Sequence, residues 1–172
     1  RYALIINDPR YIEIPASLNS TLTIKGETDR SNKLQNLIAE QLVGAGFNEI
    51  LNNSLTRKEY YSGLETFAPE HCVTLMNPLS EDLNVMRQSL LFGGLESLKR
   101  NINYRNTNLR FFEFGNCYSF DASQHHDEQS LSGYSEMQYM GLWITGKGIE
   151  SSWAHADEDA NFYQLKAYVE NI

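Results

Sequence analysis

Apolar and polar positions along the 172-residue chain follow helical periodicity in some segments and strand periodicity in others. The side-chain oxygens of the cluster 28–31 suit a helix N-terminus, and apolar residues then recur every three to four positions. This pattern predicts an amphipathic helix over Ser31–Ala45, ended by Gly44 and Gly46. Its apolar stripe consists of Leu34, Leu37, Ile38, Leu42 and Ala45. The run 47–55 follows as a predicted strand.

A second helical pattern follows Ser89, whose hydroxyl suits an N-cap. Its apolar stripe consists of Leu91, Leu95, Leu98 and Ile102. Gly93 and Gly94 lie in its first turns, where each costs about 1 kcal/mol relative to alanine. We therefore expect another element to approach the backbone closely there. A third helical pattern covers 159–172, with Phe162, Leu165, Val169 and Ile172 on one face.

Strand patterns occupy the middle of the chain. A short strand is predicted at 72–76, ended by the pair Asn77-Pro78. The segment 108–118 holds three phenylalanines and a tyrosine in eleven residues, and we expect it to pair antiparallel with 136–146. Helices around antiparallel strands indicate an α+β fold, an antiparallel sheet flanked by helices.

Composition narrows the class of protein. With 41% hydrophobic residues in 172, the chain can bury one substantial core, so one domain is expected. The net charge of −8 disfavours an autonomous RNA binder, since such proteins depend on Lys and Arg contacts to phosphate. Cys72 and Cys117 are far apart with no Cys-x-x-Cys motif, which favours buried strand residues over a disulfide or zinc site. No apolar run has transmembrane length, and a soluble, cytoplasmic protein without membrane contact is predicted.

Two motifs carry a resemblance to a known family. The run 77–91 reads Asn-Pro-Leu-Ser-Glu-Asp-Leu-Asn-Val-Met-Arg-Gln-Ser-Leu-Leu, and the run 109–118 reads Leu-Arg-Phe-Phe-Glu-Phe-Gly-Asn-Cys-Tyr. Together they closely resemble the synthetase-like core of the β subunit of bacterial phenylalanyl-tRNA synthetase. The resemblance implies a class II aminoacyl-tRNA synthetase-like core over 16–172, preceded by a connector, 1–15, from a small domain. Because the chain begins with Arg1 and stops within a helical pattern, a piece of a longer protein is expected.

The same resemblance implies that the chemistry is lost. Catalytic class II members carry an arginine that binds the α-phosphate of ATP at the position that is Ser119 here. A neutral hydroxyl cannot replace a bidentate guanidinium. The segment that forms the amino-acid pocket of the catalytic paralogue is similarly altered to Gln88, Ser89 and Leu90. We therefore expect no catalytic, cofactor or metal site in this chain.

The resemblance assigns the reaction to a larger assembly. In that family, the catalytic α subunit and the β subunit form an α2β2 enzyme that attaches phenylalanine to tRNA(Phe) using ATP and magnesium. This chain is then expected to pack against the α subunit and to meet tRNA only through the assembly. It is part of a ligase, while the fragment itself is predicted to be non-catalytic.

Two groups of residues are candidates for structural roles. Arg87 is predicted to anchor a buried carboxylate. The candidate carboxylate is Glu113. Arg110 is its neighbour in sequence, but three residues along a strand place the two on opposite faces, so Arg87 is the expected partner. The second group forms a hypothetical subunit interface, since class II folds associate through the helix that 31–45 resembles. Its members are Leu34, Leu37, Ile38, Leu42, Leu91, Leu95, Leu98 and Ile102. Self-association of the isolated chain through either helix is expected.

The sequence disfavours three other interpretations. An active class II ligase with an arginine supplied from elsewhere is disfavoured by Ser119 and by the altered run 88–90. A synthetase-like regulatory subunit, similar to the histidyl-synthetase paralogue, would carry histidine-family motifs that are not found. A metal site at His125-His126-Asp127 is disfavoured, because adjacent histidines on a loop rarely converge on one ion and a fourth ligand is missing.

Overall fold

The computed structural model describes residues 26–78, 80–125, 131–149 and 151–172. Its contacts divide the chain into two units, Arg1–Lys33 and Leu34–Ile172, and each is considered by itself. The described part of the first unit is the beginning of helix α2 (Glu27–Gly44). The predicted connector, 1–15, lies outside the described residues.

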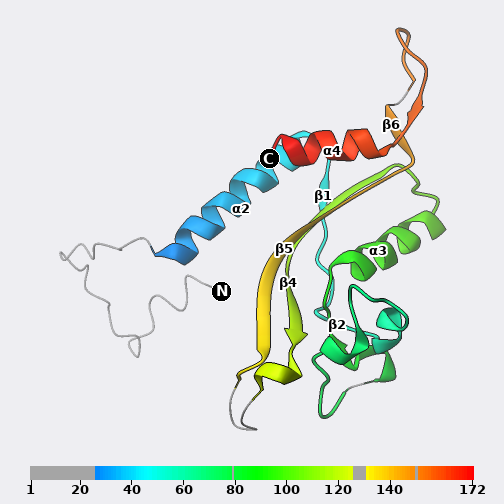
Figure 1. Ribbon diagram of the computed structural model, residues 1–172. Coiled ribbons are helices and arrows are strands. Elements are labelled where there is room, and N and C mark those ends of the chain that lie inside the picture. Colours follow the sequence, from blue (N-terminus) through cyan, green and yellow to red (C-terminus); the bar gives the residue numbers. More distant parts are fainter. Residues whose placement is uncertain (1–25, 79, 126–130, 150) are drawn as a thin grey trace, which may run out of the picture. The chain divides into compact units, whose positions relative to one another are not determined.

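The second unit holds the rest of α2 and all later elements, whose order is shown in Figure 1. Two further helices are α3 (Leu91–Asn103) and α4 (Phe162–Glu170). The strands are β1 (Asn48–Glu49), β2 (Leu55–Thr56), β3 (Val85–Met86), β4 (Leu109–Phe120), β5 (Tyr134–Thr145), β6 (Lys147–Ile149) and β7 (Glu158–Asp159). The expected α+β class is confirmed.

A long curved hairpin of β4 and β5 dominates this unit (Figure 1). The two strands pair antiparallel from Leu109–Thr145 at one end to Phe120–Tyr134 at the other, as the sequence predicted. Strand β1 joins the other edge of β4 in parallel orientation, so the sheet order is β1-β4-β5 and the sheet is mixed rather than purely antiparallel. Strands β2–β3 and β6–β7 form two small antiparallel pairs.

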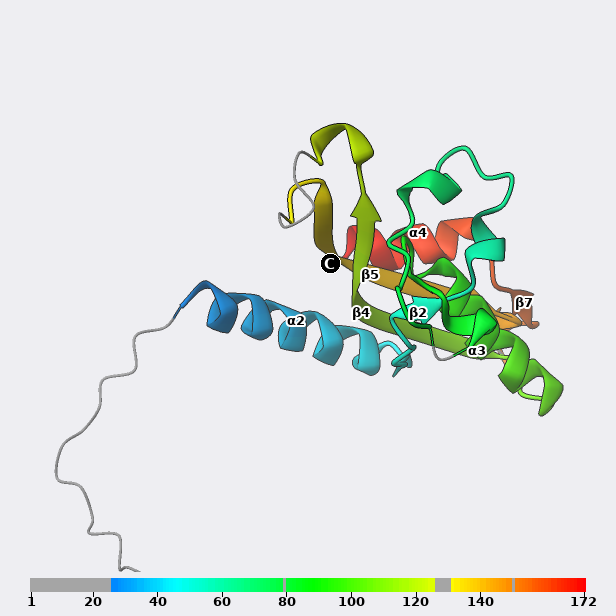
Figure 2. The same ribbon diagram turned by 90° about the horizontal axis from the view of Figure 1, so that it is seen from below.

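Alternation along β4 separates two hydrophobic clusters, one on each face of the sheet. Phe111 and Cys117 pack with Trp143 and with Leu98 of α3 on one face. Phe112 packs on the other face with residues from the end of α2, from β5 and from α4, including Leu42, Phe47 and Tyr168. Figure 2 shows α3 beside the β4–β5 ribbon. The sheet is therefore covered on both faces, and the two cores share only its strands.

Several element boundaries differ from the sequence predictions. Helix α2 begins at Glu27 rather than Ser31, and only 48–49 and 55–56 of the predicted strand 47–55 are extended pairs. Between them the chain bends so that Asn52 reaches inward to Glu113, which breaks the ladder. The predicted strand 72–76 is reduced to one bridge, Thr74–Val85.

The helix termini hold two smaller differences. Helix α3 begins at Leu91 with Leu90 as its N-cap residue, although the Ser89 hydroxyl does accept a hydrogen bond from the Leu91 amide. In α4 the predicted apolar face is mostly wrong, because Phe162, Val169 and Ile172 are 70%, 51% and 42% exposed and only Leu165 is half-buried. The face that packs inward holds Gln164, Leu165 and Tyr168 instead, since Tyr168 contacts Phe47 edge-on.

Candidate functional site

Arg87 and Glu113 form an ion pair inside the unit, on the α3 face of the sheet. The Arg87 Nη1 lies 2.6 Å from Glu113 Oε1, and the two side chains are 6% and 0% exposed. Arg87 follows β3, and its backbone donates to Ser54 and accepts from Tyr118 of β4. The structure thus brings together the two residues that the sequence singled out as a pair.

Asn52 completes the hydrogen bonding of this pair. Its backbone amide donates to Glu113 Oε1 at 3.2 Å, and its side-chain amide donates to Oε2 at 2.6 Å. Ser97 of α3 in turn donates to Asn52 Oδ1 at 2.7 Å. The Arg87 Nε donates to the Asn116 carbonyl at 2.9 Å. We call Arg87, Glu113, Asn52 and Ser97 the buried polar network; it ties β3, β4, α3 and the bend after β1 to one point.

The fit of the network explains a glycine in the strand. A Cβ at Gly115 would overlap the Arg87 guanidinium, so this strand position has to lack a side chain. Arg110 lies on the opposite face, as strand alternation requires. There it donates to the carbonyls of Ala45 and Gly148 at 2.9 and 2.6 Å. Neither arginine is free to bind a ligand on the α3 face.

Ser119, to which the resemblance assigns the position of the phosphate-binding arginine, lies near the outer end of the hairpin. Its hydroxyl is 2.7 Å from the hydroxyl of Ser135, its partner on β5. A small hollow of about 40 Å³ beside them is lined by seven residues: Gln88, Cys117, Tyr118, Ser119, Ser135, Met137 and Tyr139. All of these side chains are uncharged at neutral pH.

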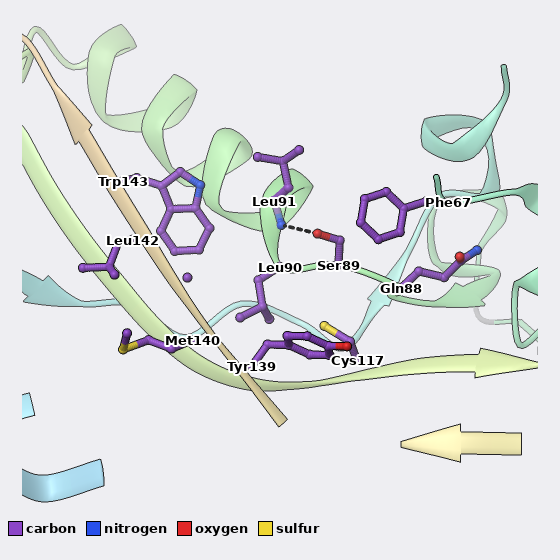
Figure 3. Close-up of a pocket in the computed structure, with 11 residues that line it drawn as sticks. Phe67, Gln88, Ser89, Leu90, Leu91, Cys117, Tyr139, Met140, Leu142 and Trp143 are labelled. Carbon is purple, nitrogen blue, oxygen red and sulfur yellow. Dashed lines mark hydrogen bonds between the residues drawn. The ribbon is translucent and has the colours of Figure 1, made fainter. Parts of the chain in front are cut away.

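A larger hollow of about 380 Å³ adjoins it at the beginning of α3 (Figure 3). Its floor is the β4–β5 hairpin, and its walls are the segment 88–91 and Phe67. Figure 3 shows the indole of Trp143 on one side and the ring of Phe67 on the other. None of the described residues that line this hollow is a Lys, Arg, Asp, Glu or His. A phosphate or a free amino acid would find no charged partner there.

The two cysteines offer no chemistry to these hollows. Burial raises the pKa of the Cys72 thiol and also that of Cys117 above the usual value, so both stay protonated at neutral pH. Both are free thiols in the interior, as the sequence indicated. Burial likewise raises the pKa of Tyr61. The described residues contain no group of three or more possible metal ligands.

Comparison with known proteins adds to this geometry. The family model described as "Phenylalanyl tRNA synthetase beta chain CLM domain" matches residues 14–172. The chain belongs to this family. Among its relatives is the phenylalanine–tRNA ligase β subunit of Bacteroides thetaiotaomicron, 65% identical over 161 residues. The match covers 94% of this chain and 20% of that protein. The β subunit from Porphyromonas gingivalis is 48% identical over the same shares of the two chains.

The CLM chain therefore spans about a fifth of the length of the relatives it matches. Its fold is similar to that of a solved Bacillus halodurans protein described as an ATP phosphoribosyltransferase regulatory subunit/histidyl-tRNA synthetase. The similarity has a TM-score of 0.52 at 16% identity and covers 82% of this chain and 34% of the other. Identity that low shows a shared synthetase-like fold alone.

The apolar stripes of α2 and α3 are only partly on the surface of the CLM domain. Leu42 and Leu98 are 2% and 6% exposed because they fill the two cores, so they cannot contact a partner and this part of the interface hypothesis is wrong. Ile38 is half-buried. The remaining five are exposed by 45–63%: Leu34, Leu37, Leu91, Leu95 and Ile102.

Two smaller sequence predictions also meet the structure here. Gly93 and Gly94 do face close neighbours, since a Cβ at Gly94 would overlap the Trp143 indole and one at Gly93 would lie 3.0 Å from Asn52 Cβ. For the 125–127 motif, only His125 belongs to the described residues, and its Nδ1 lies 2.8 Å from the Ser132 carbonyl. His126 and Asp127 lie outside them.

Sequence reasoning missed two residues of this region. Asn52 carries no periodic signal, because its role depends on a bend that follows a two-residue strand. Trp143 could have been found, since strand alternation places it opposite Phe111 and on the same face as Glu113. None of the helices in the described residues combines the length and the hydrophobicity of a transmembrane segment.

Proposed function

We propose that this CLM domain is a non-catalytic, synthetase-like module of a phenylalanine–tRNA ligase β subunit. It packs against the catalytic α subunit in an α2β2 enzyme that charges tRNA(Phe) with phenylalanine in the cytoplasm. ATP and magnesium act at the α subunit, and tRNA is met through the assembled enzyme. The module itself holds no cofactor.

The observation that carries the proposal is the uncharged face of the sheet. Nucleotide phosphates are bound by preorganised cations or by several backbone amides, usually with a metal ion. Among the described residues, only neutral side chains line the two hollows between the sheet and the beginning of α3, and Ser119 pairs with Ser135 at the arginine position. The charged hollow along α3, whose lining includes Arg57, Lys99 and Arg100, contains no residue of the sheet. The guanidinium of Arg87 lies beneath this face, but it is already paired with the Glu113 carboxylate. This face therefore lacks the electrostatics that adenylate formation needs.

The buried polar network supports a scaffolding role for the same face. It is buried beneath this face, and every member has a hydrogen-bond partner. Satisfied buried networks favour one specific arrangement of the surrounding elements. In this proposal the buried polar network keeps the module rigid, so that its outer surfaces present a fixed shape to the α subunit.

The exposed leucines of α2 and α3 are the proposed contact surface. Leu37 and Leu95 are 63% and 46% exposed, although leucines on helices of a monomer usually face its core. Burying each at an interface would contribute about 1.5–3 kcal/mol. A substitution on α2 and another on α3 test the two surfaces separately.

Assembly with the α subunit tests this proposal. The full-length β subunit is co-expressed with the α subunit as wild type or with Leu37→Glu or Leu95→Glu, and the complex is sized by analytical ultracentrifugation. At least one substitution should weaken assembly by tenfold or more, because a charge would be buried. Leu131→Glu is the control, since Leu131 is 83% exposed and belongs to neither helix. Normal assembly with both helix variants would contradict the proposed contact.

A further inference from the structure

The hollow beside α3 contains a hydrogen-bond donor that the protein leaves unused. Trp143 is 8% exposed, and its indole N–H has no partner among the described residues. Within those residues, Gln164 Oε1 is the single fully enclosed side-chain polar atom without a partner. The Trp143 nitrogen also lacks a partner, but it is not among the fully enclosed atoms. It therefore retains some contact with the space around it. Figure 3 shows it on the side of the ring that faces Leu91.

The other polar groups of the hollow are also neutral: two hydroxyls, which can donate or accept, and the side-chain amide of Gln88. The Ser89 oxygen accepts from the Leu91 amide at 3.2 Å, and its own proton has no acceptor among the described residues. The Tyr139 hydroxyl has only the Met137 sulfur, at 3.7 Å. The Gln88 amide nitrogen is bound by the Ala68 carbonyl and the Cys72 sulfur, both at 3.0 Å. A ligand here would thus be offered N–H and O–H groups.

The shape of the hollow is set by rings and by a missing side chain. Trp143 and Phe67 stand on two of its sides, and Tyr139 lies along the floor (Figure 3). Gly141 lies between Tyr139 and Trp143 on β5, and a Cβ at Gly141 would overlap the Trp143 ring. The volume of about 380 Å³ is within the range of small-molecule sites. A hollow lined by aromatic side chains suits a flat ring.

The absence of charge in the lining excludes whole classes of ligand. An amino acid, a nucleotide or a carboxylate would lose hydration without gaining an ionic partner. A neutral ring loses little hydration and gains contact with the aromatic walls. An acceptor atom on that ring would also satisfy the Trp143 N–H, which otherwise has only solvent.

We propose that this hollow is a binding site for a neutral, planar aromatic molecule with a carbonyl or ring-nitrogen acceptor, which accepts a hydrogen bond from Trp143 Nε1. The ligand belongs to the class of aromatic amides and neutral heteroaromatic bases. The inference rests on the proposed function, because it requires that phosphate and amino-acid binding have been lost from this face.

The indole resonances test the site directly. The chain has two tryptophans, and Trp153 is 100% exposed, so Trp153→Phe assigns the two indole N–H signals without disturbing the core. Benzamide is titrated into the ¹⁵N-labelled 172-residue chain. The Trp143 signal should move downfield and saturate with a dissociation constant of about 1 mM or tighter, as expected for a fragment of this size. The Trp153 signal should stay in place.

Matched ligands separate the sources of affinity. Cyclohexanecarboxamide has the same acceptor without a planar ring, and benzoate has the ring with a charge; each should bind at least fivefold more weakly than benzamide. Trp143→Phe should weaken benzamide binding by about tenfold, read from the signals of the Ser89 and Gly141 amides. Where that variant fails to fold, the comparison of the three ligands on the unaltered chain still decides.

Two different failures are distinguishable in the same experiment. A Trp143 signal that does not respond to benzamide, or that responds equally to cyclohexanecarboxamide, overturns the inference and leaves the proposed function standing. A saturable response to ATP with magnesium, or to phenylalanine, contradicts the proposed function and the inference together.

Discussion

The two ends of the β4–β5 hairpin differ sharply, although they belong to the same pair of strands. At the inner end, 109–117 paired with 137–145, both faces of β4 are covered, and Glu113 and Phe112 are fully buried. At the outer end, 118–120 paired with 134–136, the β5 residues are exposed, and two serines meet across the strands. The inner end is held by packing on both faces, whereas the outer end adds to its ladder only partly exposed contacts, such as those of the Phe120 ring with Tyr134 and His125.

This difference bears on the proposal that the module is non-catalytic. The family resemblance assigns to Ser119, at the outer end, the position of an ATP-binding arginine, so side chains at that end would serve a ligand in a catalytic enzyme. The inner end serves the fold itself, since its polar network and its glycines fit their neighbours. A protein that keeps the shape and loses the reaction can change the outer end freely, while the inner end stays constrained by packing.

The largest effect is expected from breaking the buried ion pair at the inner end. Arg87→Ala would leave the Glu113 carboxylate without its cation in a site that is 0% exposed. Such a loss typically costs about 3–5 kcal/mol of unfolding free energy. Chemical denaturation of wild type and variant measures it. Arg57→Ala is the control, because the exposed Arg57–Asp82 pair should contribute about 1 kcal/mol or less. An Arg87 loss below about 0.5 kcal/mol, the level of a surface change, would remove the contrast between the two ends.

A smaller loss is expected from filling the glycine contact between α3 and the sheet. A Cβ at Gly94 would overlap the Trp143 indole, and overpacking of this kind costs about 1–3 kcal/mol. Gly94→Ala can be compared with Gly44→Ala, where nothing lies within 4 Å. The Gly44 variant should be neutral or more stable by up to about 1 kcal/mol, from helix propensity alone. Thermal unfolding of both gives the comparison, and equal stability of the two variants would contradict the close contact.

Substitution at the outer end should barely change stability. Ser119→Ala removes an exposed hydroxyl contact to Ser135, and we expect a change within about 0.5 kcal/mol. The measurement is the same denaturation experiment as for Arg87. A loss above about 1.5 kcal/mol would show that the outer end also stabilises the fold.

The smallest effect is a pH dependence at the outer end. The hydroxyl and then the amide of Ser123 hydrogen-bond Asp121 and hold the pKa of its carboxyl below the ordinary value of 3.8. A folded-state pKa below the unfolded one adds stability above pH 3.8, and this contribution is lost as the pH falls through the folded value. The stability gap between wild type and Asp121→Asn should therefore shrink between pH 6 and pH 3. A gap that is constant over this range would show that the carboxyl is not stabilised by folding.

The regular elements of this fold could be predicted from the sequence, and the reason is their length. Strands β4 and β5 each run for twelve residues, so alternation fixed their faces and predicted their pairing. The same alternation placed Glu113 and Arg110 on opposite faces of β4, which left Arg87 as the expected partner of Glu113. The assignment of Ser119 to the position of the ATP-binding arginine followed from the family resemblance rather than from any pattern in the residues.

The short elements could not be predicted, because side chains far apart in sequence define them. Asn52 bends the chain after a two-residue strand to reach Glu113, 61 residues away. Likewise Leu42 and Leu98 belong to apolar stripes that look uniform in the sequence, yet the cores of this unit take these two and leave Leu37 and Leu95 in solvent. Periodicity identifies a stripe and cannot say which part of it a core will cover.

Calorimetric titration with ATP and magnesium tests the central claim most directly. The 172-residue chain is titrated after its folding has been verified by a cooperative unfolding transition, and Ser119→Arg is measured beside it. We predict no binding heat up to about 1 mM ATP for either protein, because neither hollow on this face offers a charged side chain and one arginine does not rebuild the site. A micromolar dissociation constant for the unaltered chain would contradict the claim that this module is non-catalytic.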